Sequence, residues 1–451
     1  MTLGTSSNKL FSNNDLKRLI LPLIIEQALA LGVGLADSIM VARVGESAVS
    51  AVSLVDSIMI LIINVFAALA TGGAVVAGQY LGQKNEEKAR EGGKQLIAAV
   101  TFISVGLMIL MYIGRGFITK GIFGAIDADV EGYANTYLLI VFASIPFIAM
   151  YNAGAALFRA MGNSKVTMFT SIIMNIINVA GNALLIYGFR MGVEGVAIPT
   201  LVSRMVAAII ILSLLFDSQL KIHFSRPFKY KPNKEMIGRI LHIGIPNGIE
   251  NSMFQLGKIM LLSVVAGFGT ASITANAVAN SITSFGLIPA IAIGLSLVTV
   301  VSQCVGAGDY AQVRYYTKKL LKYAYLSFVA MLLLILLILP LLFNLYNLSA
   351  ETANIARTLI LCHAVTACLI WPLSFSLPNT LRASNDVRYV MIVSMTSMWL
   401  FRVGFGILFA KYLNMGVLGV WIAMLVDWVV RTTFFVIRYR GSKWETIYNK
   451  E

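Results

Sequence analysis

The sequence is short of charged residues and of cysteine and histidine. Of its 451 residues only 12% are charged and 58% are hydrophobic, whereas about a quarter of a typical soluble domain is charged. Too few charges are present to coat a globule of this length, which excludes an ordinary soluble enzyme and a disordered chain. Three cysteines, Cys304, Cys362 and Cys368, match no zinc or redox spacing and exclude a disulfide scaffold.

Signatures of catalysis are missing as well. The three histidines are scattered and form no metal motif, and the chain has no Walker loop, nucleophile elbow or dinucleotide fingerprint. We therefore expect no enzyme and no cofactor. Without an ATP-binding motif on this chain, energy for uphill transport would have to come from an ion gradient.

Long apolar runs fill the space that the charges leave. A bilayer core needs about 20 apolar residues per helix. The runs between polar breaks predict an all-α, polytopic membrane protein with twelve transmembrane helices, at residues 17–42, 51–80, 95–120, 133–158, 166–188, 194–216, 238–266, 275–304, 320–346, 355–381, 388–411 and 416–438.

The basic residues predict how these helices are oriented. The formal net charge is +14, which first suggests nucleic acid, but Lys and Arg lie in short clusters between the apolar runs. Placing both termini in the cytoplasm puts 25 basic residues on that face and six on the other, as the positive-inside rule requires. We expect a multi-pass protein of the inner or plasma membrane, with the lipid bilayer as its partner and no nucleic acid.

The chain also repeats itself. One constant offset, which we call the repeat shift, places Pro22 on Pro246 and Glu26 on Glu250, and MGVEGVAIPTLV (191–202) on MGVLGVWIAMLV (415–426). An even number of spans per repeat gives both copies the same orientation. The sequence thus predicts two parallel six-helix repeats: an N-lobe at 1–220, a basic cytoplasmic loop at 221–237 and a C-lobe at 238–451. This is the architecture of a rocking carrier.

Asp37 is the sharpest candidate for ion coupling. An ionisable group inside a span is costly and marks function by default, and a carboxyl group in a nearly dry cavity can take up and release a proton. Asn178 and Asn182, four residues apart on one helical face, together with Thr200 and Asn152, offer oxygens to a protonated Asp37 or to Na⁺. The alternatives are a solvated Asp37 that pairs with Arg43, and amides that only join helices.

Each repeat also has an acid four residues after a proline. Glu26 and Glu250, with their polar neighbours Gln27, Asn251 and Gln255, are candidates for binding a cationic substrate, unless Glu26 and Glu250 pair with Lys258 and Arg204. The prolines are candidate hinges because proline removes a backbone hydrogen bond. Asp427 and Arg431, four residues apart, are expected to pair with each other.

The order and spacing of several motifs resemble one known family, the multidrug and toxic compound extrusion (MATE) transporters. These motifs are ADSIMVARVG after span one, GQYLGQKN after span two, LFRAMGNSK after span four and NVAGNALLIYG with MGVEGVAIPT across spans five and six. The resemblance implies export of organic, often cationic, compounds by proton or sodium antiport. It also implies that Asp37 is the acid of an N-lobe ion site, with Asn178, Asn182 and Thr200 as partners and Asn152 as a looser match.

The sequence departs from the family at three positions. Members with a C-lobe sodium site have carboxylates where this chain has Phe254 and Trp371, and many proton-coupled members have Asp where Asn182 stands. These departures favour coupling through Asp37 and leave sodium open at Asp37, Asn178 and Asn182.

We therefore predict a monomeric secondary antiporter for small organic molecules that are amphipathic or cationic. The alternative is a lipid-linked precursor flippase of the related superfamily, for which a strongly cationic cavity is typical.

Overall fold

A computed structural model describes residues 9–123, 127–225, 230–346 and 348–448. Within these ranges the chain is helical and has no strand. The basic residues Arg226, Lys229 and Lys450 lie outside the described residues.

The predicted spans correspond to helices. The N-lobe spans are α1 (Asn13–Ala42), α2 (Glu46–Gly82), α3 (Glu86–Ile113) continued by α4 (Arg115–Phe117) and η1 (Ile118–Ile122), α5 (Ala128–Phe142) with α6 (Ile145–Ala160), α7 (Ser164–Ala183) with η2 (Leu184–Gly188), and α8 (Glu194–Leu214). The later spans are α9 (Lys234–Ala266), α10 (Thr270–Gly306), α11 (Tyr310–Leu345), α12 (Ala350–Trp371) with η3 (Pro372–Ser376) and α13 (Leu377–Ala383), α14 (Val387–Thr396) with η4 (Ser397–Gly404), α15 (Phe405–Ile407) and η5 (Leu408–Tyr412), and α16 (Gly416–Arg440). A short 3₁₀-helix, η6 (Lys443–Thr446), follows.

Length and composition make most of these helices candidate membrane spans. Among the described residues ten helices pass as apolar spans, and the pair α5–α6, bent by 46° at its break, makes an eleventh. The remaining helix, α9, is 33 residues long but contains five charged residues. The all-α, multi-pass fold with twelve spans is confirmed.

The backbone repeats as the sequence does. Helices α2 and α10 have the same length and begin at positions that the repeat shift relates, and so do the short π-helical segments η2 and η5. Gly45 and Gly269, which precede α2 and α10, both have positive φ, a conformation that glycine adopts at no steric cost. The side chains of Asn85 and Asp309 cap α3 and α11 in the same way.

The described residues divide into two compact units, one within Asn13–Gly248 and one from Ile249 onward together with residues 9–12. We call them the N-lobe and the C-lobe. The division falls inside α9, whereas the sequence places it in the loop at 221–237. The first half of α9 packs closely on α2, because a Cβ atom at Gly72 would lie 2.6 Å from the carbonyl oxygen of Ile240.

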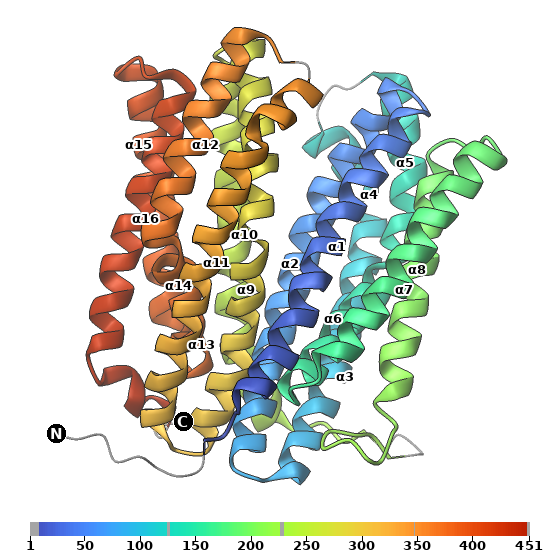
Figure 1. Cartoon of the computed structure of the whole chain (residues 1–451). Helices are drawn as coiled ribbons and strands as arrows, with labels where there is room; N and C mark the ends of the chain where they lie inside the picture. Colours follow the sequence, from blue (N-terminus) through green and yellow to red (C-terminus); the bar gives the residue numbers. More distant parts are fainter. Residues whose placement is uncertain (1–8, 124–126, 226–229, 347, 449–451) are drawn as a thin grey trace. The chain divides into compact units, whose positions relative to one another are not determined.

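Within the N-lobe, α1 packs on α7, α2 on α3, α5 and α6, and α7 on α8; Figure 1 shows α1 running beside α2 and α7. Both α1 and α9 run without interruption through the candidate hinges Pro22 and Pro246. The hinge role therefore stays a prediction.

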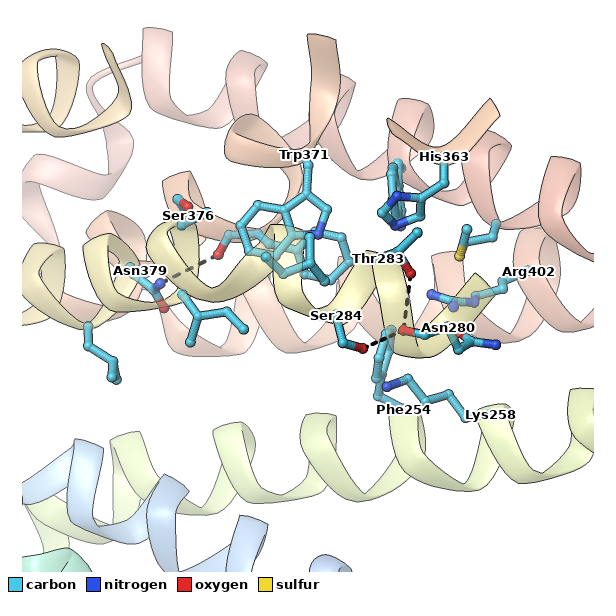
Figure 2. A pocket seen from close by; sticks show the side chains of 18 residues that line it. Phe254, Lys258, Asn280, Thr283, Ser284, His363, Trp371, Ser376, Asn379 and Arg402 are labelled. Atoms are coloured by element: carbon cyan, nitrogen blue, oxygen red, sulfur yellow. Dashed lines mark hydrogen bonds between the residues drawn. The ribbon is translucent and has the colours of Figure 1, made fainter. Parts of the chain in front are cut away.

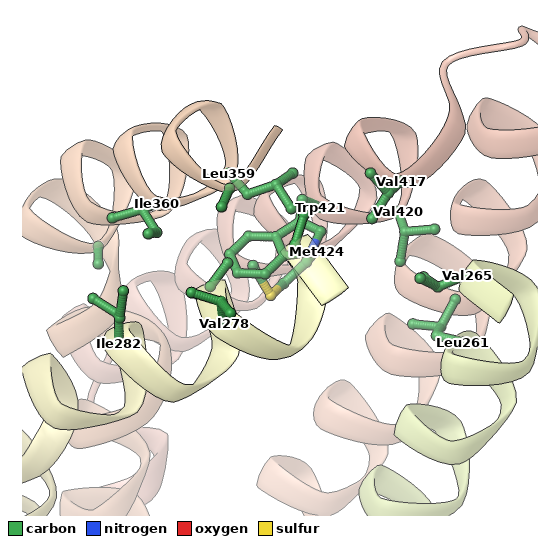
Figure 3. Packing of buried hydrophobic residues seen from close by; sticks show 14 of the residues in the cluster. Leu261, Val265, Val278, Ile282, Leu359, Ile360, Val417, Val420, Trp421 and Met424 are labelled. Atoms are coloured by element: carbon green, nitrogen blue, oxygen red, sulfur yellow. The ribbon is translucent and has the colours of Figure 1, made fainter. Parts of the chain in front are cut away.

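In the C-lobe, α10 packs on α11, α12 and α13, and α16 on α12. Buried side chains from α9, α10, α12 and α16 form one hydrophobic cluster, in which Trp421 and Met424 of α16 face Val278 of α10 (Figure 3). This cluster forms one wall of the cavity described below. The segment before α1 also belongs here, since the Tyr316 hydroxyl donates to the carbonyl oxygen of Phe11 at 2.7 Å.

Candidate functional site

Asp37 begins a chain of hydrogen bonds that joins α1, α7 and α8. Asn182 donates to Asp37 Oδ1 at 2.7 Å and reaches Asn178 Oδ1 at 3.4 Å. Asn178 in turn donates to the hydroxyl of Thr200 at 3.1 Å. The structure thus brings together Asp37, Asn178, Asn182 and Thr200, and Asp37 is held by Asn182 rather than by Arg43, which is exposed.

Two charged residues stand next to this chain of hydrogen bonds, and the sequence did not place either of them there. Asp37 interacts electrostatically with Asp56 of α2 and with Arg204 of α8, and Asp56 accepts a hydrogen bond from the Tyr137 hydroxyl at 3.2 Å. Arg204 donates to the hydroxyl of Ser144 at 2.7 Å, at the break between α5 and α6. Two carboxylates and one guanidinium leave the group with a surplus of one negative charge.

Asn152 does not join the chain of hydrogen bonds. Its amide nitrogen is buried and has no partner among the described residues. The amide oxygen of Asn182, which is fully buried, likewise has none in the described part of the chain. The Asn182 oxygen is therefore a free acceptor beside Asp37.

The repeat acids are paired with arginines. Arg159 lies 3.5 Å from Glu26, which also accepts from the Thr167 hydroxyl at 2.7 Å. Arg382 Nη2 lies 2.7 Å from both oxygens of Glu250. The alternative that both acids pair with basic residues is thus what the structure has, but the partners are Arg159 and Arg382 and not Lys258 and Arg204. Arg159 and Arg382 are themselves counterparts in the two repeats, at an offset one position smaller than the repeat shift. Each lobe therefore forms the same pair between its first and its fourth span.

The other predicted polar residues contribute less. Gln27, Asn251 and Gln255 are half-buried. The expected pair of Asp427 with Arg431 is also corrected: Arg431 lies 3.6 Å from Glu250, while Asp427 accepts from the Ser397 hydroxyl and lies 3.9 Å from Arg402. Contacts with side chains of other helices thus replace the expected pair of Asp427 and Arg431 along α16.

The C-lobe contains a cavity of about 400 Å³. An adjoining cavity of about 220 Å³ shares Lys258, Asn280 and Arg402 with it. Figure 2 shows Phe254 and Lys258 projecting from α9 toward Asn280 of α10 and toward Arg402. Trp371 and Phe375 stack with ring centroids 4.9 Å apart and form an aromatic wall. Phe254 and Trp371, where C-lobe sodium sites have carboxylates in the resembling family, thus line this cavity.

Two π-helical segments supply part of this lining. Phe375 and Ser376 lie in η3, and Arg402 lies in η4. The corresponding stretches of the N-lobe, in α6 and α7, are α-helical. At Arg382 the offset between the two repeats is one position smaller than the repeat shift, and by Met415 it equals the repeat shift again. The C-lobe thus has one extra residue in this stretch, which the i→i+5 turns of η4 accommodate.

The repeat places the two sites at equivalent positions. By the repeat shift, Asp37 corresponds to Leu261 and Asp56 to Asn280. By the same shift Asn178 corresponds to Arg402. Both carboxylates of the N-lobe group are thus lost in the C-lobe, where an arginine stands in place of an amide.

A polytopic helical protein built from two repeated six-span lobes has the architecture of a membrane transporter. The family model described as MatE matches residues 22–184 and, at the repeat shift, 246–408. The chain therefore belongs to the MATE family of transporters, as the motifs implied.

Relatives extend over nearly the whole chain. An uncharacterized transporter, YisQ, of Bacillus subtilis is 28% identical over 430 residues, covering 94% of this chain and 93% of its own. A probable multidrug resistance protein, NorM, of Thermotoga maritima is 24% identical over 438 residues, covering 96% of this chain and 93% of its own. The outward-facing structure of a multidrug resistance MATE family transporter of the MOP superfamily superimposes with a TM-score of 0.88, at 21% identity over 97% of this chain and 96% of its own.

Proposed function

We propose that this protein is a monomeric secondary antiporter that exports small organic molecules and takes its energy from a cation gradient through Asp37. Family membership and relatives named as multidrug resistance proteins support export. The single observation that carries the coupling step is the chain from Asp37 through Asn182 and Asn178 to Thr200. Because hydrogen bonds link Asp37 of α1 to α7 and α8, a change in the charge of Asp37 can change how these three helices pack.

The proton is the coupling ion that this geometry favours. The group around Asp37 has one surplus negative charge, which one proton or one Na⁺ would neutralise. Sodium needs several oxygen ligands, but the Asn182 nitrogen faces Asp37 and the Thr200 hydroxyl is engaged with Asn178 and Val196. The guanidinium of Arg204 further repels a metal cation. No cluster of three acidic, His or Cys residues occurs in the described ranges.

In the proposed cycle, Asp37 is protonated from the outer side while the substrate leaves. Neutral Asp37 loses its attraction to Arg204, and α1 then repacks against α7, with bending at Pro22. Release of the proton into the cytoplasm restores the carboxylate. Both termini are cytoplasmic, in the inner or plasma membrane, as the basic residues indicate.

One observation favours a second candidate. A lipid-linked precursor flippase is expected to have a cationic cavity, and the C-lobe cavity has Lys258 and Arg402 in its lining. The match of the MatE model to both repeats and the named relatives favour export of soluble compounds.

The test is transport in proteoliposomes, with an imposed pH gradient compared with an imposed sodium gradient. Asp37→Asn should abolish gradient-driven efflux while the protein remains folded and inserted. The matched control is Asp129→Asn, which removes an exposed carboxylate of α5 in the same lobe. Efflux at the wild-type rate in Asp37→Asn would refute the coupling role, and efflux driven only by sodium would refute the choice of proton.

A further inference from the structure

The cavity of the C-lobe has a surplus of positive charge. Lys258 and Arg402 line it, and Arg431 stacks on its Phe375 at 4.4 Å. The acids that contact these groups are already engaged: Glu250 by Arg382 and Arg431, and Asp427 by Ser397 and, at 3.9 Å, Arg402. Four basic and two acidic side chains leave two positive charges without a matching acid.

The lining of the cavity also contains buried hydrogen-bond donors that have no acceptor within the described ranges. Arg402 is 9% exposed, and its Nε–H has no acceptor among the described residues. The indole N–H of Trp428, 2% exposed, also has none in the described part of the chain. A buried donor without an acceptor is costly. A ligand that supplies acceptor oxygens would satisfy both donors.

The two cations are arranged around one ring. Lys258 Nζ and the Arg402 guanidinium each lie 5.1 Å from the centroid of Phe254. Both residues line the two adjoining cavities, so an anionic group in this space is attracted by both. The neighbouring wall is aromatic, since Trp371, Phe375 and Trp428 pack together. A cavity of about 400 Å³ is of the size that drug-like ligands occupy.

From these contacts we propose that the C-lobe cavity binds an amphipathic aromatic anion, with its carboxylate, sulfonate or phosphate between Lys258 and Arg402 and its ring against Trp371 and Phe375. This inference rests on the proposed export function and assigns its substrate class. It replaces the expectation that Glu26 and Glu250 bind a cationic substrate, because each of these acids is neutralised by an arginine.

The two lobes then have different tasks. The N-lobe retains Asp37 and Asp56, while the C-lobe positions equivalent to them hold Leu261 and Asn280. A carboxylate in the C-lobe cavity would repel an anion. Its loss there, together with Arg402 at the position of Asn178, fits a division between an ion-coupling lobe and an anion-binding lobe.

Binding can be measured without any gradient, so its outcome is independent of coupling. All five tryptophans lie at position 371 or later, so energy transfer from tryptophan to a dansyl group reports on ligands in the C-lobe. Three probes share the dansyl ring: dansylglycine is an anion, dansylamide is neutral, and a dansyl derivative with a trimethylammonium group is a cation. The full chain in phosphatidylcholine nanodiscs is titrated with each.

We expect dansylglycine to bind about tenfold or more tightly than the other two, as charge-assisted hydrogen bonds imply. Lys258→Gln and Arg402→Gln should each weaken dansylglycine about tenfold and leave dansylamide unchanged. Lys318→Gln, an exposed lysine of the same lobe, is the control. Lys258→Glu should reverse the preference toward the cation. Equal or tighter binding of the cation by the wild type, or unchanged dansylglycine binding in both Gln variants, would overturn the proposal.

Two further measurements distinguish a lipid anion from a soluble one, and the proposed anion site from the proposed export function. Phosphatidylglycerol in the nanodiscs competes with dansylglycine if a lipid headgroup is the occupant, and has no effect if the occupant is a soluble anion. Asp37→Asn should bind dansylglycine normally but fail to transport it. Normal binding without gradient-driven transport in the wild type would refute the exporter and leave the anion site standing.

Discussion

The buried pair of Glu250 with Arg382 allows a quantitative prediction. Arg382 Nη2 lies 2.7 Å from both carboxylate oxygens, and the two side chains are only 7% and 10% exposed. Arg382→Gln leaves the carboxylate buried without its donor. Removing one partner of a buried pair costs about 3–5 kcal/mol. Because Arg431 remains 3.6 Å from Glu250, we expect a smaller loss, about 2–3 kcal/mol.

For a unit of this size each kcal/mol lowers Tm by about 2–4 °C, so thermal unfolding in detergent should shift by about 4–12 °C. Arg159→Gln is the matched comparison and should cost less, because the Arg159–Glu26 contact is longer, 3.5 Å, and Thr167 still donates to Glu26. The double variant Glu250→Gln/Arg382→Gln should recover most of the loss. A shift within about 1 °C for Arg382→Gln, or a double variant less stable than the single one, would refute the reasoning.

Two further predictions concern α2 and the ion site. Gly72→Ala should destabilise the N-lobe by about 1–3 kcal/mol, since the new Cβ would meet backbone atoms of α9 at 2.6 and 2.9 Å. Thermal unfolding measures this loss. The control is Gly238→Ala, whose Cβ meets nothing within 4 Å and which should be no less stable than the wild type. Asn182→Asp places a second carboxyl group where the amide lies 2.7 Å from Asp37. Two carboxylates at this distance disfavour the ionisation of both, so the pH of half-maximal transport should rise. An unchanged pH profile would contradict the contact between these two residues.

The sequence was sufficient for the fold because the fold repeats. The helical period, the length of the apolar runs and the repeat shift can all be read from the sequence, and each predicted span overlaps a helix. The polar first turns of α3 and α11 were missed, since these helices begin at Glu86 and Tyr310 and not at 95 and 320. The link between Asp37 and Asn182 was also foreseeable, since few polar residues are available inside the N-lobe spans.

Pairings between distant helices were not foreseeable from spacing. Arg159 and Arg382 lie at the ends of predicted spans and were counted as cytoplasmic charges, yet they reach Glu26 and Glu250. Asp56 lies near the start of its predicted span and has no motif around it, yet it interacts with Asp37 and Tyr137. One signal was present: Asp56 and Asn280 are repeat counterparts, and so are Arg159 and Arg382.

The extra residue in η4 has a consequence for how duplicated lobes can diverge. An inserted residue turns the side chains that follow it by about 100° around the helix axis, and the wider turn takes up the added length locally. The next segment, η5, is back in step with η2. A difference of one residue can therefore change which side chain, here Arg402, faces the interior of one lobe, while the segments that follow keep their counterparts in the other lobe.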